Sequence, residues 1–447
     1  MNHMAASSHF VFLGHEENIT QGTIRFRYEL AHVGVTHTFV ETFSFDPTRV
    51  APTRCPSNVI NRILDALLLI LGMSYWKTYC PKKLVLEGMT LTPKQAAFWN
   101  TVYTKGLGEF YYRNKIDFRM LVQFPHSRNE MTSAILCPRK DRSLVQLGGG
   151  KDSIVTAELL KAAKKPFSLI TIAPHRVQES VAGEIGEDYV PIVRMMDTQL
   201  FELNKRPGVT NGHIPISAMY AFVDLLCAAL FDYRYIIASN EESASYGNVS
   251  YLGEEINHQW SKSFEFERLF REYVHEYITP DIQYFSLLRP WKEIKIVKEF
   301  TKYPQYFPLF SSCNKNFRQQ GKAEKLWCGE CPKCAFVFLM LAAFLPKEKV
   351  VAILNKNLFT DERLLVLFRE LLGFEGIKPF ECVGNPDEAQ YALWRVGKTG
   401  DYDTDPVFVQ LKTALAGKWS EIEASGSSLL IASPIHAIPQ DFREVIL

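Results

Sequence analysis

The segment LVQLGGGKDS, residues 144–153, joins an apolar run to three consecutive glycines and then to the start of an amphipathic pattern. Glycine lets a backbone approach a phosphate closely, and the N–H groups of a helix's first turn favour an anion at that place. Lys151 adds a positive charge, Asp152 can hold a magnesium ion that bridges phosphate oxygens, and Ser153 offers a hydroxyl. The alternative is a glycine-rich turn that only starts a helix. The pattern predicts a phosphate-binding loop formed by Gly148, Gly149, Gly150, Lys151, Asp152 and Ser153.

Strand and helix patterns alternate around this loop. The sequence has neither GxxxxGK[ST] nor GxGxxG, which excludes a Walker A loop and a dinucleotide fingerprint. Strand patterns occupy residues 143–147, 167–173 and 235–239, and helix patterns occupy residues 153–164 and 216–231. Such alternation is typical of βαβ units and predicts an α/β fold with a parallel sheet.

The chain divides into three parts by pattern. Before the polar segment at residues 137–142, strand patterns (11–13, 23–29 and 37–45) come first. They precede one helix ending at Gly72 and another capped by Thr92. After Pro346 the chain is mostly helical, with Thr360 or Asp361 capping a stretch that ends at Gly373. We expect an N-terminal α+β module over residues 1–140, an α/β domain over 141–345 and a mainly helical region over 346–447.

Composition excludes several classes of protein. The 447 residues are 47% hydrophobic and 22% charged, which excludes intrinsic disorder. The net charge of +1 argues against a dedicated DNA-binding protein, and we expect no nucleic-acid partner. The longest apolar runs, residues 66–73 and 335–345, fall short of the roughly 20 residues of a spanning helix. No secretory signal is visible at residues 1–10, so we expect a cytoplasmic protein without a membrane partner.

Four of the nine cysteines crowd into a short segment. Cys313 is followed after fourteen residues by Cys328, Cys331 and Cys334, which form two successive CxxC turns. Four thiolates are the number that a closed tetrahedral zinc site needs, and soft ligands select zinc over magnesium. A redox pair and free thiols are the alternatives. The spacing predicts a structural zinc site.

Polar side chains gather at three places after or between the predicted elements. His213, in a Gly-His-Ile-Pro loop, is either a ligand-positioning or a purely structural histidine. Asn240 and Glu241 follow the strand at 235–239, where parallel sheets bind ligands, although a solvated turn is the alternative. The segment NHQWSKS, which begins at Asn257, suits a carboxylate-rich or sugar-phosphate ligand.

Three residues are candidates for proton transfer. His258 and Lys262 are four positions apart and would share a face if their segment is helical. Either acts as a general base if its pKa is tuned. Cys382 lies outside the zinc cluster and is either a buried, inert residue or a catalytic thiol.

The string GGGKDS resembles the SGGxDS loop of the ATP pyrophosphatase (PP-loop, adenine nucleotide α-hydrolase-like) superfamily, with Gly148 in place of the usual serine. The resemblance implies a PP-loop fold that cleaves ATP between its α and β phosphates and adenylylates a substrate. It also implies that adenine lies near Ala173 and Pro174. The four cysteines are placed similarly to the zinc site of 7-cyano-7-deazaguanine synthase.

A longer set of strings resembles one family within that superfamily. LGGGKDS, NGHIPISA, SNEESAS, NHQWSKSFEFE, WCGECPKC and KPFECVG occur in this order between residues 144 and 384. Together they are similar to the bacterial UDP-N-acetyl-α-muramoyl-L-alanyl-L-glutamate epimerase (MurL) family of peptidoglycan biosynthesis. The resemblance implies inversion of the terminal L-Glu of UDP-MurNAc-L-Ala-L-Glu to D-Glu, with ATP and magnesium as cofactors and AMP and pyrophosphate released. The zinc cofactor is expected from the four cysteines.

This family implies roles but no base that can be transferred residue by residue. We expect Asp152 to act in the ATP reaction through magnesium, and Lys262, His258 and Cys382, in that order, as candidates for the base. The expected substrate-binding residues are His213, Asn240, Glu241, Asn257, His258 and Lys262. The N-terminal module is the expected site for the uridine diphosphate. The rival hypotheses are a PP-loop enzyme that adenylylates a nucleobase or a tRNA, and a nucleotide sensor without turnover.

Overall fold

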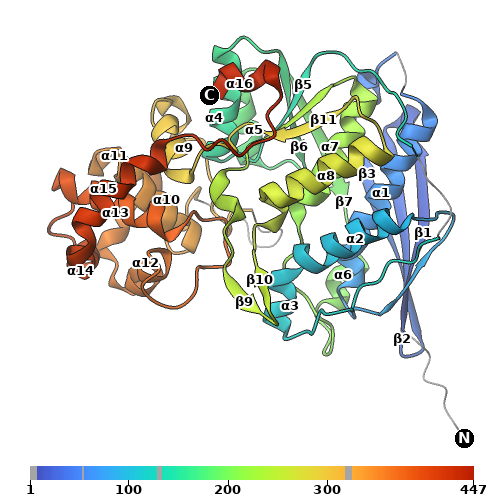
Figure 1. The fold of residues 1–447 in the computed structure, drawn as a ribbon, viewed down its shortest axis with the longest axis horizontal. Coiled ribbons are helices and arrows are strands. Elements are labelled where there is room, and N and C mark those ends of the chain that lie inside the picture. Colours follow the sequence, from blue (N-terminus) through green and yellow to red (C-terminus); the bar gives the residue numbers. More distant parts are fainter. Residues whose placement is uncertain (1–7, 53–54, 128–132, 318–324, 447) are drawn as a thin grey trace, which may run out of the picture.

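The computed structural model describes residues 8–52, 55–127, 133–317 and 325–446, so the N-terminal residues 1–7, examined above for a secretory signal, lie outside it. One sheet of nine strands, in the order β11-β8-β5-β6-β7-β3-β2-β1-β4, runs through the molecule (Figure 1). Its strands are β1 (His9–Asn18), β2 (Thr23–His32), β3 (Val35–Ser44), β4 (Lys83–Leu86), β5 (Ser143–Gln146), β6 (Phe167–Ile172), β7 (Tyr189–Met195), β8 (Tyr235–Ala238) and β11 (Gln283–Ser286).

Sixteen α-helices surround the sheet within the described residues. They are α1 (Ser57–Trp76), α2 (Pro93–Gly106), α3 (Gly108–Asn114), α4 (Lys151–Ala162), α5 (Arg176–Ile185), α6 (Thr198–Leu203), α7 (Ile216–Phe231), α8 (Phe264–Tyr277), α9 (Glu293–Phe300), α10 (Pro332–Ala342), α11 (Lys347–Leu354), α12 (Leu365–Leu371), α13 (Pro386–Thr399), α14 (Pro406–Leu415), α15 (Trp419–Gly426) and α16 (Gln440–Ile446). The strand and helix patterns predicted around residues 143–173 and 216–239 are therefore confirmed.

Half of the sheet is parallel and wound in two directions from β5. Strands β11, β8, β5, β6 and β7 pair in parallel. From β5 the chain adds β6 and then β7 on one side, and later adds β8 and then β11 on the other side of β5. In such a sheet the helices of the two directions cover opposite faces. The loops after β5 and β8 then diverge, and this crevice is where open α/β sheets bind ligands. The predicted α/β class with a mostly parallel sheet is confirmed.

The two faces of the sheet belong to different cores because successive side chains of a strand point to opposite sides. One face packs with α1, α7 and α8, and the other packs with α4, α5, α9 and α10. The first face contributes Leu144, Ile170, Ile236 and Tyr284, and the second contributes Val145, Leu169, Ile237 and Phe285. These strands are apolar on both sides, as is typical of a central parallel sheet.

The strands of the first 140 residues continue the same sheet. Strand β3 pairs antiparallel with β7, so β1, β2 and β3 extend the parallel half instead of forming a sheet of their own. A buried ion pair crosses this junction, with Arg194 Nε 2.6 Å from Glu41 Oε1. Tyr75 donates a hydrogen bond to the other carboxylate oxygen of Glu41 at 2.9 Å. The buried polar groups at this junction therefore have hydrogen-bond or ion-pair partners.

Helix α1 corrects one prediction, because Gly72 lies inside it and the helix continues to Trp76. A Cβ atom at Gly72 would lie 2.5 Å from the ring of Phe12 and 3.0 Å from that of Tyr28. Glycine is therefore required here by the close approach of β1 and β2, and it does not mark the end of the helix.

Helix α1 is also long and apolar enough to cross a membrane, judged by length and composition alone. The uninterrupted apolar run at residues 66–73 is only one part of this helix. Its most apolar segment is 83% buried inside the protein, so α1 serves as a core helix. Cys55, just before α1, forms a disulfide with Cys137, a pairing that the sequence patterns did not reveal.

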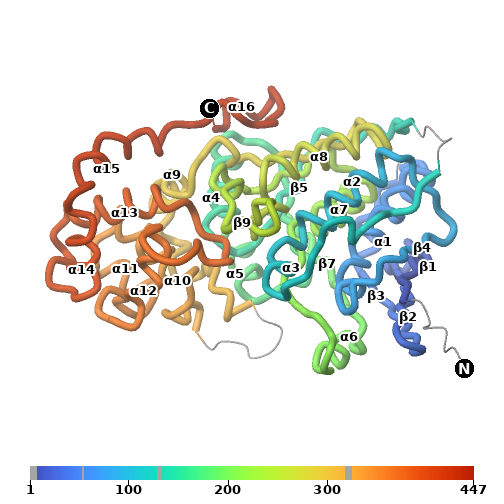
Figure 2. Tube along the Cα trace, turned by 60° about the horizontal axis from the view of Figure 1, so that its bottom comes forward, coloured from blue at the N-terminus to red at the C-terminus, as the bar shows by residue number. Residues whose placement is uncertain are grey.

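The helices from α10 to α15 gather at the end of the molecule opposite β1 and β2 (Figure 1). After Pro346 the described residues form helices α11 to α16 and no strand. From α15 the chain runs back across the molecule to α16 (Figure 2). There Phe442 packs against Tyr235 of β8, with ring centroids 4.8 Å apart.

Candidate active site

The glycine-rich loop lies at the carboxyl end of β5, in the crevice where the sheet changes winding direction. Gly149 has φ +79°, and a Cβ there would lie 2.9 Å from Val177, so this position requires glycine. At Gly148, by contrast, a Cβ would meet nothing within 4 Å. Gln178 of α5 fixes the loop by donating to the carbonyl of Leu147 at 3.1 Å. Among the residues that the structure describes, no side chain caps α4, so the first backbone N–H groups of the helix have no side-chain partner there.

The charged residues of the loop are tied to α9. The Lys151 amine is buried, lies 2.5 Å from Asp152 Oδ1 and pairs with the buried carboxylate of Glu293. Burial by itself would lower the pKa of Lys151, but the two carboxylates raise it above its usual range. Burial also raises the pKa of Glu293, to about 7. Lys151 is thus held beneath the loop, while Asp152 remains partly exposed and Ser153 donates to the Gly150 carbonyl at 3.0 Å.

The three candidates for proton transfer meet at one point. Lys262 Nζ lies 3.4 Å from Cys382 Sγ. The His258 ring is close enough to the thiol for each group to shift the pKa of the other. The spacing of four positions would place the two residues on one face of a helix, but they do not approach the thiol from one helix. His258 lies in a turn, and Lys262 ends a short 3-10 helix, Trp260–Lys262.

Glu109 is the member of this cluster that the sequence analysis missed. Its Oε2 accepts a hydrogen bond from His258 Nδ1 at 2.5 Å and lies 3.7 Å from His213 Nδ1. Arg113 donates to its other carboxylate oxygen at 2.5 Å. Glu109 is buried in α3 among apolar neighbours, and an acidic residue on the buried side of a helix is the signal that could have revealed it.

The two histidines differ in charge. Burial opposes protonation of His258, but its hydrogen bonds to Cys382 and Glu109 raise its pKa to about 9. Burial and the charge of His258 lower the pKa of His213 to about 3, so His213 is neutral. Their ring centroids are 4.3 Å apart. His213 therefore packs beside the charged histidine as an uncharged polar neighbour.

The Cys382 thiol is surrounded by positive charge. Burial opposes its ionisation, yet Lys262 and His258 lower its pKa well below the usual value. The thiolate also helps to raise the pKa of Lys262. Cys382 is a partly exposed residue, and a thiol with a lowered pKa is the more reactive form of cysteine.

Backbone contacts hold the Cys382 loop in place. Asn248 donates to the carbonyls of Lys378 and Pro379, at 3.2 and 2.9 Å. Gln259 donates to the carbonyl of Val383 at 3.2 Å, so residues on both sides of the thiol are anchored. The thiol is thereby positioned by fixed backbone on either side.

A chain of side chains joins this cluster to the glycine-rich loop. Lys333, in the first turn of α10, donates to the Cys382 carbonyl and lies 3.9 Å from Glu293 Oε1. Glu293 in turn pairs with Lys151 of the loop. The negative charge of Asp152 also contributes to the raised pKa of Lys262. Side-chain contacts therefore connect the loop and the cluster.

The remaining candidates have side chains or backbones engaged within the protein. Asn240 is buried and its carbonyl accepts from Ser286, while the Glu241 carbonyl accepts from Arg289. The charge of Glu241 acts on Lys262 and contributes to its raised pKa. Asn257 donates to the carbonyl of Ala244 at 2.9 Å and shapes the turn that carries His258. These residues border the cluster and support its geometry.

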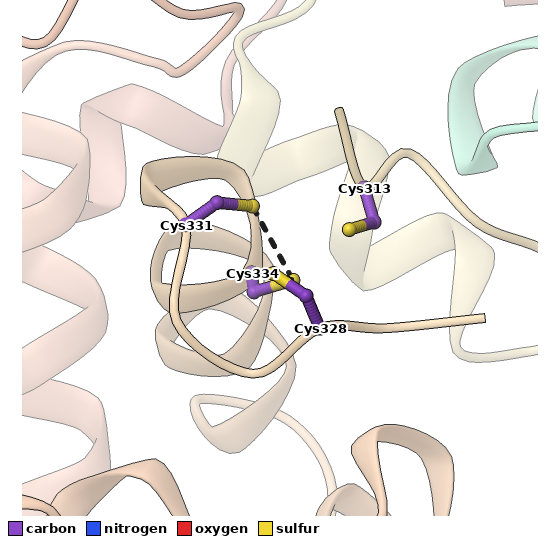
Figure 3. A group of neighbouring side chains, drawn as sticks. All are labelled: Cys313, Cys328, Cys331 and Cys334. Carbon is purple, nitrogen blue, oxygen red and sulfur yellow. Dashed lines mark hydrogen bonds between the residues drawn. The ribbon is translucent and has the colours of Figure 1, made fainter. Parts of the chain in front are cut away.

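The four predicted metal-binding cysteines come together (Figure 3). Sulfur atoms of all four lie within 4.8 Å of one another, with Cys334 Sγ 3.5 Å from Cys331 and 3.7 Å from Cys328. Four bonds of about 2.3 Å at tetrahedral angles place sulfurs about 3.8 Å apart, so the arrangement fits zinc. Cys331 is the N-cap of α10 and Cys334 lies in its first turn, beside Lys333, which contacts the Cys382 loop.

Known proteins resemble the chain along nearly its whole length. A family model described as the MurL N-terminal domain matches residues 1–287, and one described as the MurL C-terminal domain matches residues 309–425. A curated relative named UDP-N-acetyl-alpha-D-muramoyl-L-alanyl-L-glutamate epimerase, from Xanthomonas oryzae pv. oryzae, is 37% identical over 82% of this chain and 82% of its own. Relatives with the same name come from Salinispora tropica, 35% identical over 91% and 88%, and from a Micromonospora species, 34% identical over 98% and 97%.

Proposed function

The chain belongs to the MurL family, and from this premise we propose that it inverts the terminal L-glutamate of UDP-MurNAc-L-Ala-L-Glu to D-glutamate, with ATP cleaved to AMP and pyrophosphate. The substrate is the one that the names of its relatives print. D-Glutamate made in this way enters the peptidoglycan precursor. A nucleotide-linked precursor is water-soluble, which supports a cytoplasmic enzyme.

The need for ATP follows from the acidity of the α-proton. Removing a proton beside a carboxylate places two negative charges on neighbouring atoms, so the proton is very weakly acidic. Adenylylation of the carboxylate removes its charge and turns the carbonyl into an electron sink. An ordinary side chain is then able to abstract the α-proton.

We assign the ATP phosphates to the loop Gly148–Ser153, in the crevice beside β5. The uncapped start of α4 supports this assignment, since its N–H groups and dipole favour the phosphate charge. Ala173, at the end of β6, has φ +53°, an uncommon conformation for a residue other than glycine. Such strain is frequent at ligand sites and supports this turn as the place for adenine.

The residues present also fit two metal ions. Asp152 Oδ1 is paired with Lys151, while the partly exposed carboxylate retains a second oxygen for magnesium, which would neutralise charge on the phosphates. Cys313, Cys328, Cys331 and Cys334 would hold zinc in a closed, structural site. Zinc bound there would fix the start of α10, and with it the position of Lys333, which contacts the Cys382 loop.

The observation that carries the proposal is the contact chain between the two parts of the site. Lys333 touches the Cys382 carbonyl and approaches Glu293, which pairs with Lys151 of the loop. These contacts support a site in which a carboxylate activated at the loop would be near His258, Lys262 and Cys382. We place the uridine diphosphate on the N-terminal part of the chain, by size alone.

The test is to incubate the protein with UDP-MurNAc-L-Ala-L-Glu, magnesium and ATP, to hydrolyse the product, and to determine the chirality of its glutamate. D-Glutamate that forms only with ATP, together with AMP, supports both the substrate and the activation. L-Glutamate unchanged without AMP contradicts the proposal and directs the search to nucleobase or tRNA acceptors. Inversion without AMP would retain the epimerase and reject the adenylate.

A further inference from the structure

His258 lies between the carboxylate of Glu109 and the thiol of Cys382. His258 uses Nδ1 to bind Glu109 at 2.5 Å, which leaves its other ring nitrogen for the Cys382 thiol. A nucleophile within hydrogen-bond reach of a base, which is itself oriented by a third group, is the layout of nucleophilic catalysis.

The packing of the cluster also argues against a pair of opposed bases. Inversion by two bases requires one group on each face of the α-carbon. Lys262 Nζ lies 3.4 Å from the Cys382 sulfur, and His258 is close enough to lower the pKa of the same thiol. No α-carbon fits between Lys262 and Cys382, which already touch, so these two groups do not serve as bases on opposite faces of a substrate.

The position of the thiol suits attack on an activated carboxylate. Side-chain contacts through Glu293 and Lys333 connect Lys151 of the glycine-rich loop to the Cys382 carbonyl. The loop of Cys382 is anchored by Asn248 and Gln259, so the sulfur is held in place before the acyl group arrives. Such positioning replaces a slow encounter between two molecules by reaction within one site.

We propose that Cys382 attacks the carbonyl carbon of the glutamyl adenylate and forms a thioester with the terminal glutamate, on which inversion takes place. The proposal rests on the proposed function, because the adenylate is its starting point. The bond between sulfur and carbon forms, the bond between that carbon and the AMP oxygen breaks, and AMP leaves with the electron pair.

The thioester suits the next steps chemically. A neutral thioester stabilises an α-carbanion as its enolate far better than a carboxylate does. Acylation removes the thiolate charge beside His258, so the imidazolium releases its proton to solvent and becomes a base. His258 takes the α-proton, solvent returns a proton to the opposite face, and water cleaves the thioester. The carboxylate is released in the D configuration and the thiol is restored, so the cycle consumes one ATP and one water.

The experiment is a single turnover with UDP-MurNAc-L-Ala-L-[14C]Glu, magnesium and ATP, quenched in acid from milliseconds to seconds. Radioactivity in the denatured protein, released as a hydroxamate by neutral hydroxylamine, is the expected result. It should appear before D-glutamate and map to the peptide of Cys382. AMP is measured in the same samples, so loss of the adenylate is distinguished from loss of the thioester.

Two variants at position 382 and one control complete the test. Cys382→Ala and the near-isosteric Cys382→Ser should carry no thioester and slow D-glutamate formation by more than about 10³-fold. Both should still form the adenylate, trapped as free hydroxamate. Cys227→Ala, which changes a buried thiol in α7, should label as the wild type does. Wild-type protein that forms AMP and D-glutamate without bound label at any time would overturn the thioester and leave the proposed function standing. So would D-glutamate formation by Cys382→Ala at the normal rate.

Discussion

His258 Nδ1 lies 2.5 Å from Glu109 Oε2, although the two residues are 149 positions apart in the sequence. The carboxylate is buried and also binds Arg113, so it cannot turn away from the histidine without losing a second partner. This contact fixes which ring nitrogen faces Cys382. It also helps to keep His258 protonated while the thiol beside it is ionised.

Glu109→Gln should move the alkaline limb of the activity profile to lower pH. The pKa of His258 is raised to about 9, against the effect of burial, by Cys382 and Glu109. The charged histidine is therefore present below that pH and lost above it. Removing the carboxylate charge should lower the pKa of His258, and with it the midpoint of the alkaline limb, by about 1–3 pH units. The measurement is kcat/KM against pH, and an unshifted limb with only a lower rate would reduce Glu109 to a packing role.

Lys262→Met should make Cys382 harder to ionise. Burial already opposes the thiolate, and the Lys262 charge is the main group that lowers the pKa of Cys382. Without that charge, the thiol should ionise at a higher pH. The rate of alkylation of Cys382 by iodoacetamide, followed by mass spectrometry across pH, measures the midpoint. Lys105→Met, which removes an exposed cation paired with Glu265, is the matched control and should not move it.

Asp152→Asn should abolish AMP formation without unfolding the protein. The variant keeps the shape of the side chain but removes the charge that would hold magnesium at the loop, and we expect a loss of about 10²-fold or more. AMP release is measured by chromatography, and folding by the melting temperature. Asp141→Asn, at an exposed ion pair with Arg234, is the control. Normal AMP release by Asp152→Asn would remove the assignment of this loop to ATP.

Cys331→Ser should release zinc and destabilise the helical end of the molecule. The wild type is expected to contain one zinc ion per chain, measured by mass spectrometry of the metal. The variant is expected to lose it and to melt at least about 5 °C lower. Cys227→Ala removes a thiol outside the cluster and should retain the metal. A wild-type protein purified without zinc, and unaffected by its addition, would favour a redox pair or free thiols.

Gly72→Ala should destabilise the protein although alanine is the better helix former. The new methyl group would lie 2.5 Å from the Phe12 ring, and overpacking of this kind costs about 1–3 kcal/mol. Gly183→Ala in α5, where a Cβ meets nothing within 4 Å, should instead stabilise by about 0.5–1 kcal/mol. Urea unfolding of the two variants measures both changes. Equal changes in the free energy of unfolding for the two variants would show that β1 shifts to make room for the added methyl group.

The sequence by itself determined the features that depend on residues close together in the chain. The strand before Gly148 and the helix after it follow from apolar periodicity, and the N-terminal cap of α2 follows from Thr92 and Gln95. The four cysteines, with two CxxC turns among them, pointed to the cluster that the structure brings together. Patterns of this kind survive in the sequence because backbone geometry and ligand spacing act over a few residues.

Only the tertiary structure decided how the distant parts of the site meet. Lys262 and Cys382 are 120 positions apart, and Glu109 reaches His258 from a helix that precedes the parallel sheet. Gly72, which marks a helix end by local rules, is required instead by the ring of Phe12 on a neighbouring strand. Such contacts are set by how helices and strands pack in three dimensions, and packing leaves no fixed spacing in the sequence. The charges that make Cys382 a thiolate therefore became visible only when the fold brought them together.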